Sequence, residues 1–214
     1  MKPPEQESDA AVQATVIVCS RNPRADGFER VLAALAGQTL PPDQWNLLIV
    51  DNASSPPISR PDAPGLPETR VVVEETPGLT PARLRGIAEA DGELLVFVDD
   101  DNVLASDYLA QALSLMNRRP DLGAWSGRVM PEFESPPPAW IRPFWSHLAL
   151  AEIEADAWSS RPYPDDVLPV GAGLCIRQHL ARAYAEEVRG DPLRQALDRA
   201  DGSTASGGDT DMAL

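Results

Sequence analysis

The chain has 214 residues, which is long enough to bury one sizeable hydrophobic core or two small ones. Hydrophobic residues make up 43% of it and charged residues 24%, a composition typical of globular rather than disordered proteins. The formal net charge of −15 argues against a nucleic-acid-binding or anionic-membrane-binding surface, because both polyanions would repel the chain.

Charge and cysteine content narrow the possible sites further. Lys2 is the only lysine, so we expect any bound phosphate group to be met by arginine, a helix N-terminus or a metal cation. Cys19 and Cys175 lie in apolar segments and predict reduced core thiols.

Residues 1–13 predict a disordered N-terminal tail. The absence of a signal peptide and of a membrane-spanning apolar run predicts a cytoplasmic protein without a transmembrane segment.

Apolar segments rich in β-branched residues recur along the first half of the chain and predict strands. They span residues 14–19, 46–50, 70–74 and 93–98. None of them alternates cleanly between apolar and polar residues. We therefore expect each strand to be buried on both faces, as in a parallel sheet that is covered by helices.

Helical patterns lie between these strands. Apolar residues repeat at helical spacing within residues 27–40, and Thr80 predicts the N-cap of a second helix with Pro81 at its first position. A third helix is expected to begin after Ser106 and to end before Pro120. Strands that alternate with helices predict the α/β class, with a Rossmann-like sheet of mainly parallel strands flanked by helices.

The second half of the chain is less regular. Residues 122–129 and 167–177 predict two further strands, and residues 179–189 predict a helix. Residues 130–145 are rich in proline and aromatic side chains, and their pattern matches no regular element. Residues 201–214 predict a flexible, acidic end.

Three aspartates, Asp99, Asp100 and Asp101, directly follow the fourth predicted strand. In open α/β sheets, ligands bind beyond the carboxyl ends of the strands. Because side chains alternate along an extended chain, Asp99 and Asp101 should share one side, where a cation would relieve their mutual repulsion. Mg²⁺ and Mn²⁺ both suit such oxygen ligands, and either ion would also bind a diphosphate.

Five segments of the sequence form an ordered set. They are TVIVCSRN (15–22), LLIVDNASS (47–55), ETPGLTPARLRGIAEADGELLVFVDDDN (75–102), GAGLCIR (171–177) and GGDTDMAL (207–214). In order and spacing they resemble the family 2 glycosyltransferases with the GT-A fold, and the segment that contains the aspartate triplet is the most specific. The resemblance covers about residues 14–214. It implies a GT-A domain with a nucleotide-binding half at about 14–105 and an acceptor-side half at about 106–214.

The resemblance implies a metal-dependent enzyme that transfers a sugar, with inversion, from a nucleoside diphosphate sugar to a hydroxyl acceptor. The implied nucleotide-sugar-binding residues are Ser20, Asn22, Asp51, Arg83, Asp99 and Asp100. Within this set, Asp51 would contact the nucleotide base and Asp99 would face the ribose. Asp101 would hold a Mn²⁺ or Mg²⁺ ion that bridges the diphosphate.

The last segment implies the catalytic base, which falls on Asp209. Gly208 stands where the family usually has glutamate, so Asp211 stays an alternative base. Members of the family usually continue through a further helix at this point. We therefore also expect that the chain is a fragment of a longer enzyme, truncated at its C-terminus.

Two alternative functions remain at this stage. The segment FVDDDNVL (97–104) also resembles the first motif of haloacid-dehalogenase-type phosphatases, although that motif usually opens the fold and three predicted strands precede it here. The other alternative is a non-catalytic module that binds a nucleotide sugar without transferring it.

The motifs do not define the acceptor. A glycan of a growing polysaccharide, a lipid carrier and a small molecule all remain possible, and membrane association is expected only through the acceptor. Trp140, Trp145 and Trp158 are candidates to stack on an acceptor sugar, with packing of the proline-rich segment as an equal alternative.

Overall fold

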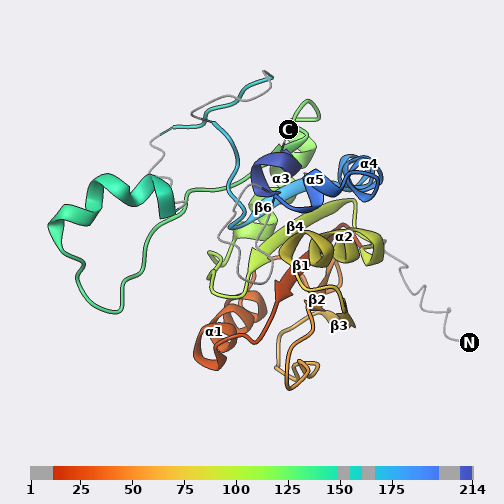
Figure 1. Cartoon of the computed structure of the whole chain (residues 1–214), viewed down its shortest axis with the longest axis horizontal. Helices are drawn as coiled ribbons and strands as arrows, with labels where there is room; N and C mark the ends of the chain where they lie inside the picture. The colour runs from red at the N-terminus through yellow and green to blue at the C-terminus, as the bar shows by residue number, and fades with distance from the viewer. Residues whose placement is uncertain (1–11, 149–154, 161–166, 198–207, 214) are drawn as a thin grey trace, which may run out of the picture.

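A computed structural model of the chain describes residues 12–148, 155–160, 167–197 and 208–213 (Figure 1). The strands are β1 (Ala14–Ser20), β2 (Trp45–Asp51), β3 (Glu68–Val73), β4 (Leu94–Asp99), β5 (Ala124–Trp125) and β6 (Leu174–Arg177). The helices are α1 (Ala25–Ala36), α2 (Leu79–Glu89), α3 (Tyr108–Arg118), the 3-10 helix η1 (Ala139–Leu148), α4 (Gln178–Arg189), α5 (Pro192–Gln195) and α6 (Gly208–Ala213).

The strands form one sheet of six strands in the order β3-β2-β1-β4-β6-β5. β1 pairs in parallel with β2 and with β4, and β2 pairs in parallel with β3. β6 runs antiparallel to both β4 and β5. A mainly parallel sheet flanked by helices confirms the predicted fold class.

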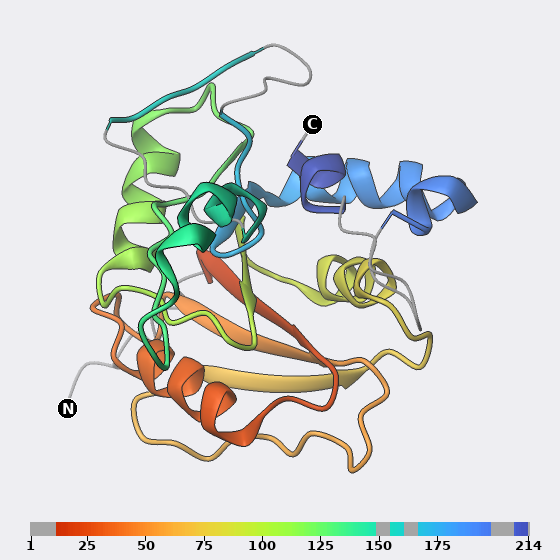
Figure 2. The same cartoon turned by 60° about the vertical axis from the view of Figure 1, so that its left-hand side comes forward.

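Helices cover both faces of the sheet (Figure 2). On one face, apolar residues of α1 and α3 pack with alternate residues of β1, β2 and β4. On the other face, α2 and α4 pack against the remaining residues of the same strands, and Met212 of α6 joins this second cluster. The sheet is therefore the middle layer of three, which explains why its central strands are mainly apolar.

The prediction that every strand is buried on both faces is confirmed for β1, β2 and β4 but is wrong for β3. Val71 and Val72 are partly exposed, and the side chain of Val73 is 52% exposed. β3 is an edge strand that pairs only with β2, so solvent reaches residues that an inner strand would bury.

Two ends of predicted elements also differ from the structure. α2 begins at Leu79, so Gly78 is its N-cap and Thr80 lies within its first turn. Gly78 has a φ of 138°, which glycine adopts more readily than threonine, and its N–H donates to the side chain of Asn52.

Residues 208–213, predicted to be part of a flexible end, form α6, because Met212 is buried and Asp211 is ion-paired. Residues 201–207 lie outside the described part of the chain.

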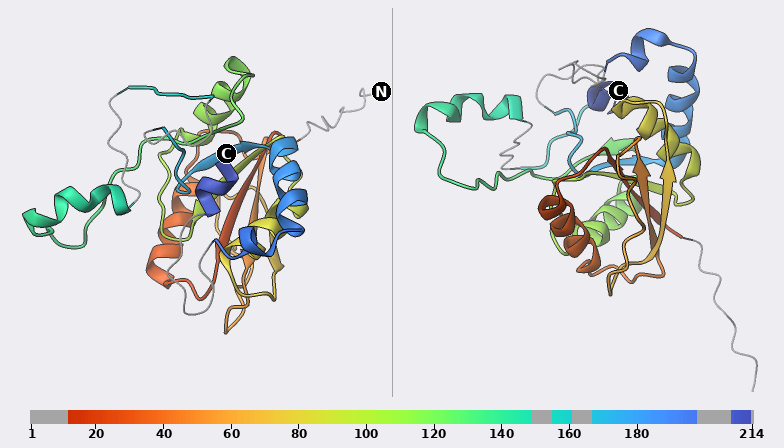
Figure 3. Two further views of the ribbon diagram at one scale, coloured as in Figure 1. Left: turned by 45° about the horizontal axis from the view of Figure 1, so that its top comes forward. Right: turned by 60° about the horizontal axis from the view of Figure 1, so that its bottom comes forward.

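The proline-rich segment that matched no element extends away from the body of the molecule, and η1 begins within it (Figure 3). Met130, Trp140 and Phe144 are more than half exposed on this segment. The rings of Trp140 and Phe144 meet edge to face, with 6.4 Å between their centroids. The segment therefore presents aromatic surface to solvent.

Most of the predicted N-terminal tail lies outside the described residues. At its end, the N–H of Gln13 donates to the carbonyl of Gln44 at 2.8 Å, so the sheet hydrogen bonding already begins there. Among the described residues, no helix combines the length and apolar composition that crossing a bilayer requires.

Candidate active site

The carboxyl ends of β1, β2 and β4 meet at one edge of the sheet, because the three strands are parallel. The pairing register sets Ser20 opposite Asp51 and Cys19 opposite Asp99. β2 and β3 follow β1 on one side of it in the sheet, whereas β4 pairs with its other side, so the strand order reverses at β1. Such a reversal at the carboxyl ends is the usual ligand-binding position in open α/β sheets.

β1 and β4 are joined at this edge by their polar residues. The hydroxyl of Ser20, which is 4% exposed, donates a hydrogen bond to the carboxylate of Asp100. Burial raises the pKa of Asp100, the nearby charge of Asp101 adds to this, and the bond from Ser20 opposes it. Asp100 is partly buried, whereas Asp101 is exposed. The end of β4 is thus a site of concentrated negative charge, with Asp101 its most accessible carboxylate.

Asp51 organises the loop that follows β2. Its side chain is 1% exposed, and its two carboxylate oxygens accept hydrogen bonds from the N–H groups of Ser54 and Ile58, each at 2.9 Å. Burial alone would raise the pKa of Asp51, but the hydrogen bonds from Ser54 and Ile58 outweigh it and hold the pKa below its ordinary value. The carboxylate is therefore ionised when it anchors this loop.

Asn22 ties the loop after β1 to the loop after β2. Its N–H donates to the hydroxyl oxygen of Ser54 at 2.9 Å, and its side-chain oxygen accepts from the N–H of Ser55 at 2.8 Å. Asn22 has a φ of 53°, in the left-handed region that asparagine tolerates better than most residues. The strand register and the hydrogen bonds between the loops thus place Ser20, Asn22 and Asp51 at the same edge of the sheet.

Asn52 is a site-building residue that the sequence analysis missed. Its side-chain amide donates to the carbonyls of Glu74 and Thr76 at 3.2 and 2.7 Å, and its oxygen accepts from the N–H of Gly78 at 2.8 Å. Asn52 is 4% exposed. It fixes the connection from β3 into α2, and a polar residue directly after a buried strand was the signal that could have identified it.

Arg83 lies on α2 and is 5% exposed. It is near Tyr184 of α4. Burial and the neighbouring Asp211 raise the pKa of Tyr184, and the positive charges of Arg194 and Arg83 act against that rise. Arg83 is therefore buried on α2, close enough to Tyr184 for its charge to act on the pKa of that residue.

The two candidate bases both belong to α6. Asp211 is held by Arg194, whose Nε lies 3.0 Å from each of its carboxylate oxygens. The side chain of Asp211 is 18% exposed. Asp209 lies in the same helix, two residues earlier, and its side chain is outside the described atoms.

Tyr108 is a second residue that the sequence analysis missed. Its hydroxyl donates to the carbonyl of Gly173 and accepts from the N–H of Gly127 at 3.2 Å. A Cβ on Gly173 would lie 2.6 Å from the Tyr108 hydroxyl, and Gly173 has a φ of 79°, so only glycine fits well there. The N–H of Gly173 also donates to the carbonyl of Phe97 at 3.0 Å. Tyr108 therefore fixes the segment before β6 beside the end of β4.

The described residues do not enclose a metal by themselves, since no group of three or more His, Cys, Asp or Glu side chains among them could hold one. Mg²⁺ and similar ions are commonly bound by one or two carboxylates together with substrate phosphates. The carboxylates at the end of β4 fit that second arrangement, in which a diphosphate completes the coordination.

The role of Asp51 can be tested through stability. We expect Asp51→Asn to lower the free energy of unfolding by about 1–3 kcal/mol at pH 7, because the new amide N–H₂ would face an N–H donor. The pKa of Asp51 is lowered in the folded protein, so its stabilisation exists above the unfolded pKa, about 3.9, and is lost as pH falls through the folded pKa. In urea unfolding experiments from pH 7 to pH 2.5, the difference in the free energy of unfolding between wild type and variant should become smaller as the pH falls.

The matched control is Asp43→Asn, an exposed aspartate in the connection before β2. It should change stability by less than about 0.5 kcal/mol at every pH. The anchoring role would be contradicted if Asp51→Asn had the same free energy of unfolding as the wild type at pH 7. It would also be contradicted if the difference between the two stayed constant down to pH 2.5.

Known proteins resemble this chain in sequence and in fold. The sequence profile of glycosyl transferase family 2 matches residues 15–166. No curated protein matches the chain in sequence. Among solved structures, residues 1–349 of TarS from S. aureus align with a TM-score of 0.61 and 16% identity, covering 94% of this chain and 55% of that one.

Two similar structures contain nucleotide sugars. TarS 1–349 in complex with UDP-GlcNAc aligns with a TM-score of 0.57 and 17% identity, over 80% of this chain and 47% of that one. The mannosyltransferase PcManGT from Pyrobaculum calidifontis, in complex with GDP-Man and Mn²⁺, aligns with a TM-score of 0.56 and 26% identity, over 80% of this chain and 46% of that one.

The chain spans about half the length of these solved chains. The similarity to TarS, at its low identity, establishes the fold alone. The family profile, however, matches well over half of the sequence, and it includes the strands that carry the aspartates of the site. The resemblance to the family is therefore confirmed, although the segments 171–177 and 207–214 lie outside the matched residues: this chain belongs to glycosyl transferase family 2 and has the GT-A fold.

Proposed function

We propose that the chain binds a nucleoside diphosphate sugar at the carboxyl ends of β1, β2 and β4 and transfers the sugar, with inversion, to a hydroxyl acceptor. The observation that supports this most is the register that sets Ser20 opposite Asp51 and Cys19 opposite Asp99, at the point where strand order reverses. Family membership supports the same activity. It also weighs against the haloacid-dehalogenase alternative for the aspartate triplet.

The nucleoside would lie against the loops after β1 and β2. Asp51 anchors the loop that would meet the base, and any direct contact from its carboxylate would use the lone pairs left by Ser54 and Ile58. Ser20 and Asn22 would line the nucleoside, and Asp99 would accept from the ribose hydroxyls. These loops are already held by hydrogen bonds, so little ordering would be needed when the nucleotide binds.

The diphosphate would lie beside the end of β4. Asp101, which is exposed, is the proposed ligand of Mn²⁺ or Mg²⁺, and Asp100 would support it through the bond to Ser20. When bound, the ion would stabilise the charge that develops on the leaving diphosphate. Arg83 is proposed to contribute positive charge on the nucleotide side, in a fold whose only lysine is Lys2.

Asp209 is the proposed general base. It would take the proton of the acceptor hydroxyl while that oxygen attacks the anomeric carbon from the face opposite the diphosphate. The bond from the anomeric carbon to the diphosphate breaks, and its electron pair leaves with the diphosphate, so the configuration inverts. Asp211 is less suited to this task, because both of its oxygens lie against the guanidinium of Arg194.

The acceptor is proposed only as a class. A glycan, a lipid carrier and a small molecule all present a hydroxyl group, and hexosyl transfer in polysaccharide biosynthesis is one context that would suit them. Trp140 and Trp158 are 68% and 63% exposed, and so are available to stack on a sugar ring. A cytoplasmic location, with membrane contact through the acceptor, stays a prediction. So does the division of the domain into halves at about residue 105.

The metal role is tested by replacing Asp101. With UDP or GDP present, Asp101→Ala should weaken Mn²⁺ binding at least about tenfold, because one of the few protein ligands is lost. Electron paramagnetic resonance of free Mn²⁺ in nucleotide titrations measures this directly. Asp107→Ala, at an exposed aspartate that follows the same loop, is the control and should bind as wild type does. If Asp101→Ala and the wild type bound Mn²⁺ equally well, Asp101 would not be the ligand.

The base is tested by replacing Asp209 with asparagine. We expect transfer to fall by a factor of about 10²–10⁴ while nucleotide affinity stays within about twofold, since proton removal and donor binding use different groups. Transfer from UDP-GlcNAc and GDP-Man to a panel of nitrophenyl glycosides provides the assay. Retained turnover in Asp209→Asn would shift the role to Asp211. Nucleotide binding by the wild type without any transfer would favour the non-catalytic alternative.

A further inference from the structure

The helix that carries Asp209 cannot hold its position by itself. α6 has six residues, and helices of that length are not stable in isolation. Contacts of Met212 and Asp211 attach it to the rest of the molecule. Met212, which is 5% exposed, packs in the apolar cluster that includes Ala82 and Leu174, and Asp211 forms an ion pair with Arg194.

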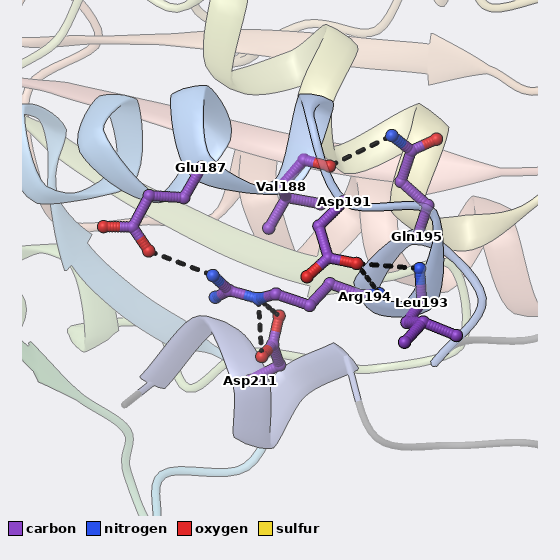
Figure 4. Close-up of polar contacts among 7 residues, drawn as sticks. All are labelled: Glu187, Val188, Asp191, Leu193, Arg194, Gln195 and Asp211. Carbon is purple, nitrogen blue, oxygen red and sulfur yellow. Dashed lines mark hydrogen bonds and ion pairs between the residues drawn. The ribbon is translucent and has the colours of Figure 1, made fainter.

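The ion pair has well-defined geometry (Figure 4). Nε of Arg194 lies 3.0 Å from both carboxylate oxygens of Asp211, and one terminal nitrogen lies 3.0 Å from Glu187 of α4. The guanidinium also lies 5.2 Å from the ring centroid of Tyr184. The side chains of Arg194 and Asp211 are 27% and 18% exposed, whereas that of Glu187 is 71% exposed. The contact with Asp211 is therefore the better shielded of the two ion pairs.

Arg194 is itself fixed to α4. Asp191 caps α5 by accepting from the N–H groups of Leu193 and Arg194 at 2.9 and 3.3 Å. The side chain of Gln195 donates to the carbonyls of Val188 and Arg189 at the end of α4. α4 in turn packs on the sheet through its buried residues, so Arg194 is held by the core while it binds α6.

We propose that Arg194 is a positioning residue for the catalytic base: by clasping Asp211, it sets the place of the α6 backbone that carries Asp209. This inference rests on the proposed role of Asp209. It assigns a structural task to Asp211, the residue that the sequence alone had left as an alternative base. Tyr184 supports the clasp, because the guanidinium of Arg194 lies 5.2 Å from the centroid of its ring.

The test compares three variants of the whole chain. Arg194→Ala removes the clasp, Arg194→Lys keeps the charge without the guanidinium geometry, and Glu187→Gln removes only the exposed ion pair of the same arginine. The first readout is hydrogen exchange of the peptide that covers residues 208–214, with the β4 peptide as an internal standard for global folding. The second is the kcat and the donor KM of sugar transfer, together with the Kd of the nucleoside diphosphate.

In Arg194→Ala, the amide hydrogens of the α6 peptide should exchange about tenfold faster, while those of the β4 peptide should exchange at the wild-type rate. Its kcat should fall about tenfold to a hundredfold, because a small displacement of a catalytic group is costly, with the donor KM and nucleotide Kd within about twofold. Arg194→Lys should recover part of both effects. Glu187→Gln should match the wild type within about twofold.

Three outcomes would overturn the inference. Unchanged exchange of the α6 peptide in Arg194→Ala would mean that the ion pair does not hold the helix. Faster exchange with unchanged kcat would mean that holding the helix does not serve catalysis. A kcat loss in Glu187→Gln as large as that in Arg194→Ala would mean that Asp211 is not the relevant partner.

The exchange readout does not depend on sugar transfer, so it separates this inference from the proposed function. If the wild type transfers no sugar with any donor, the proposed function fails, and the positioning role fails with it. Faster exchange in Arg194→Ala would then still establish the clasp as a purely structural contact.

Discussion

The parallel pairing of β1 with β2 and β4 is the constraint on which the rest of the structure depends. The register of these strands alone sets Ser20 beside Asp51 and Cys19 beside Asp99. The buried stretches of β1, β2 and β4 are mainly apolar, and the acidic residues of these strands, Asp51 and Asp99, stand at the carboxyl edge. Helices on both faces then leave that edge as the open end of the sheet.

Hydrogen bonds from buried side chains convert this edge into a defined surface. Asp51 anchors the loop after β2, Asn22 joins that loop to the one after β1, and Asn52 holds the entry to α2. On the other side of β4, Tyr108 holds Gly173. Most of the conformational ordering is thus completed when the chain folds, which would favour the proposed binding of a nucleotide sugar.

The parts of the fold that depend on local pattern were predictable, and those that depend on distant partners were not. The strands from 14–19 to 93–98 and the cluster of aspartates follow from apolar runs that end in polar residues. The edge position of β3 was not predictable, because it depends on which strands pair. Nor was α6, since its acidic, glycine-rich sequence forms a helix only through Met212 and the ion pair with Arg194. Tyr108 was missed because its partners, Gly127 and Gly173, are remote in sequence.

This edge of the sheet is proposed to bind a nucleoside diphosphate together with a divalent ion. The first measurement is isothermal titration calorimetry of the wild-type chain with UDP, GDP and dTDP, each with Mn²⁺ and again with EDTA. We expect at least one nucleotide to bind and its binding to be lost in EDTA. Binding that is equal with Mn²⁺ and with EDTA, or no binding of any nucleotide, would contradict it.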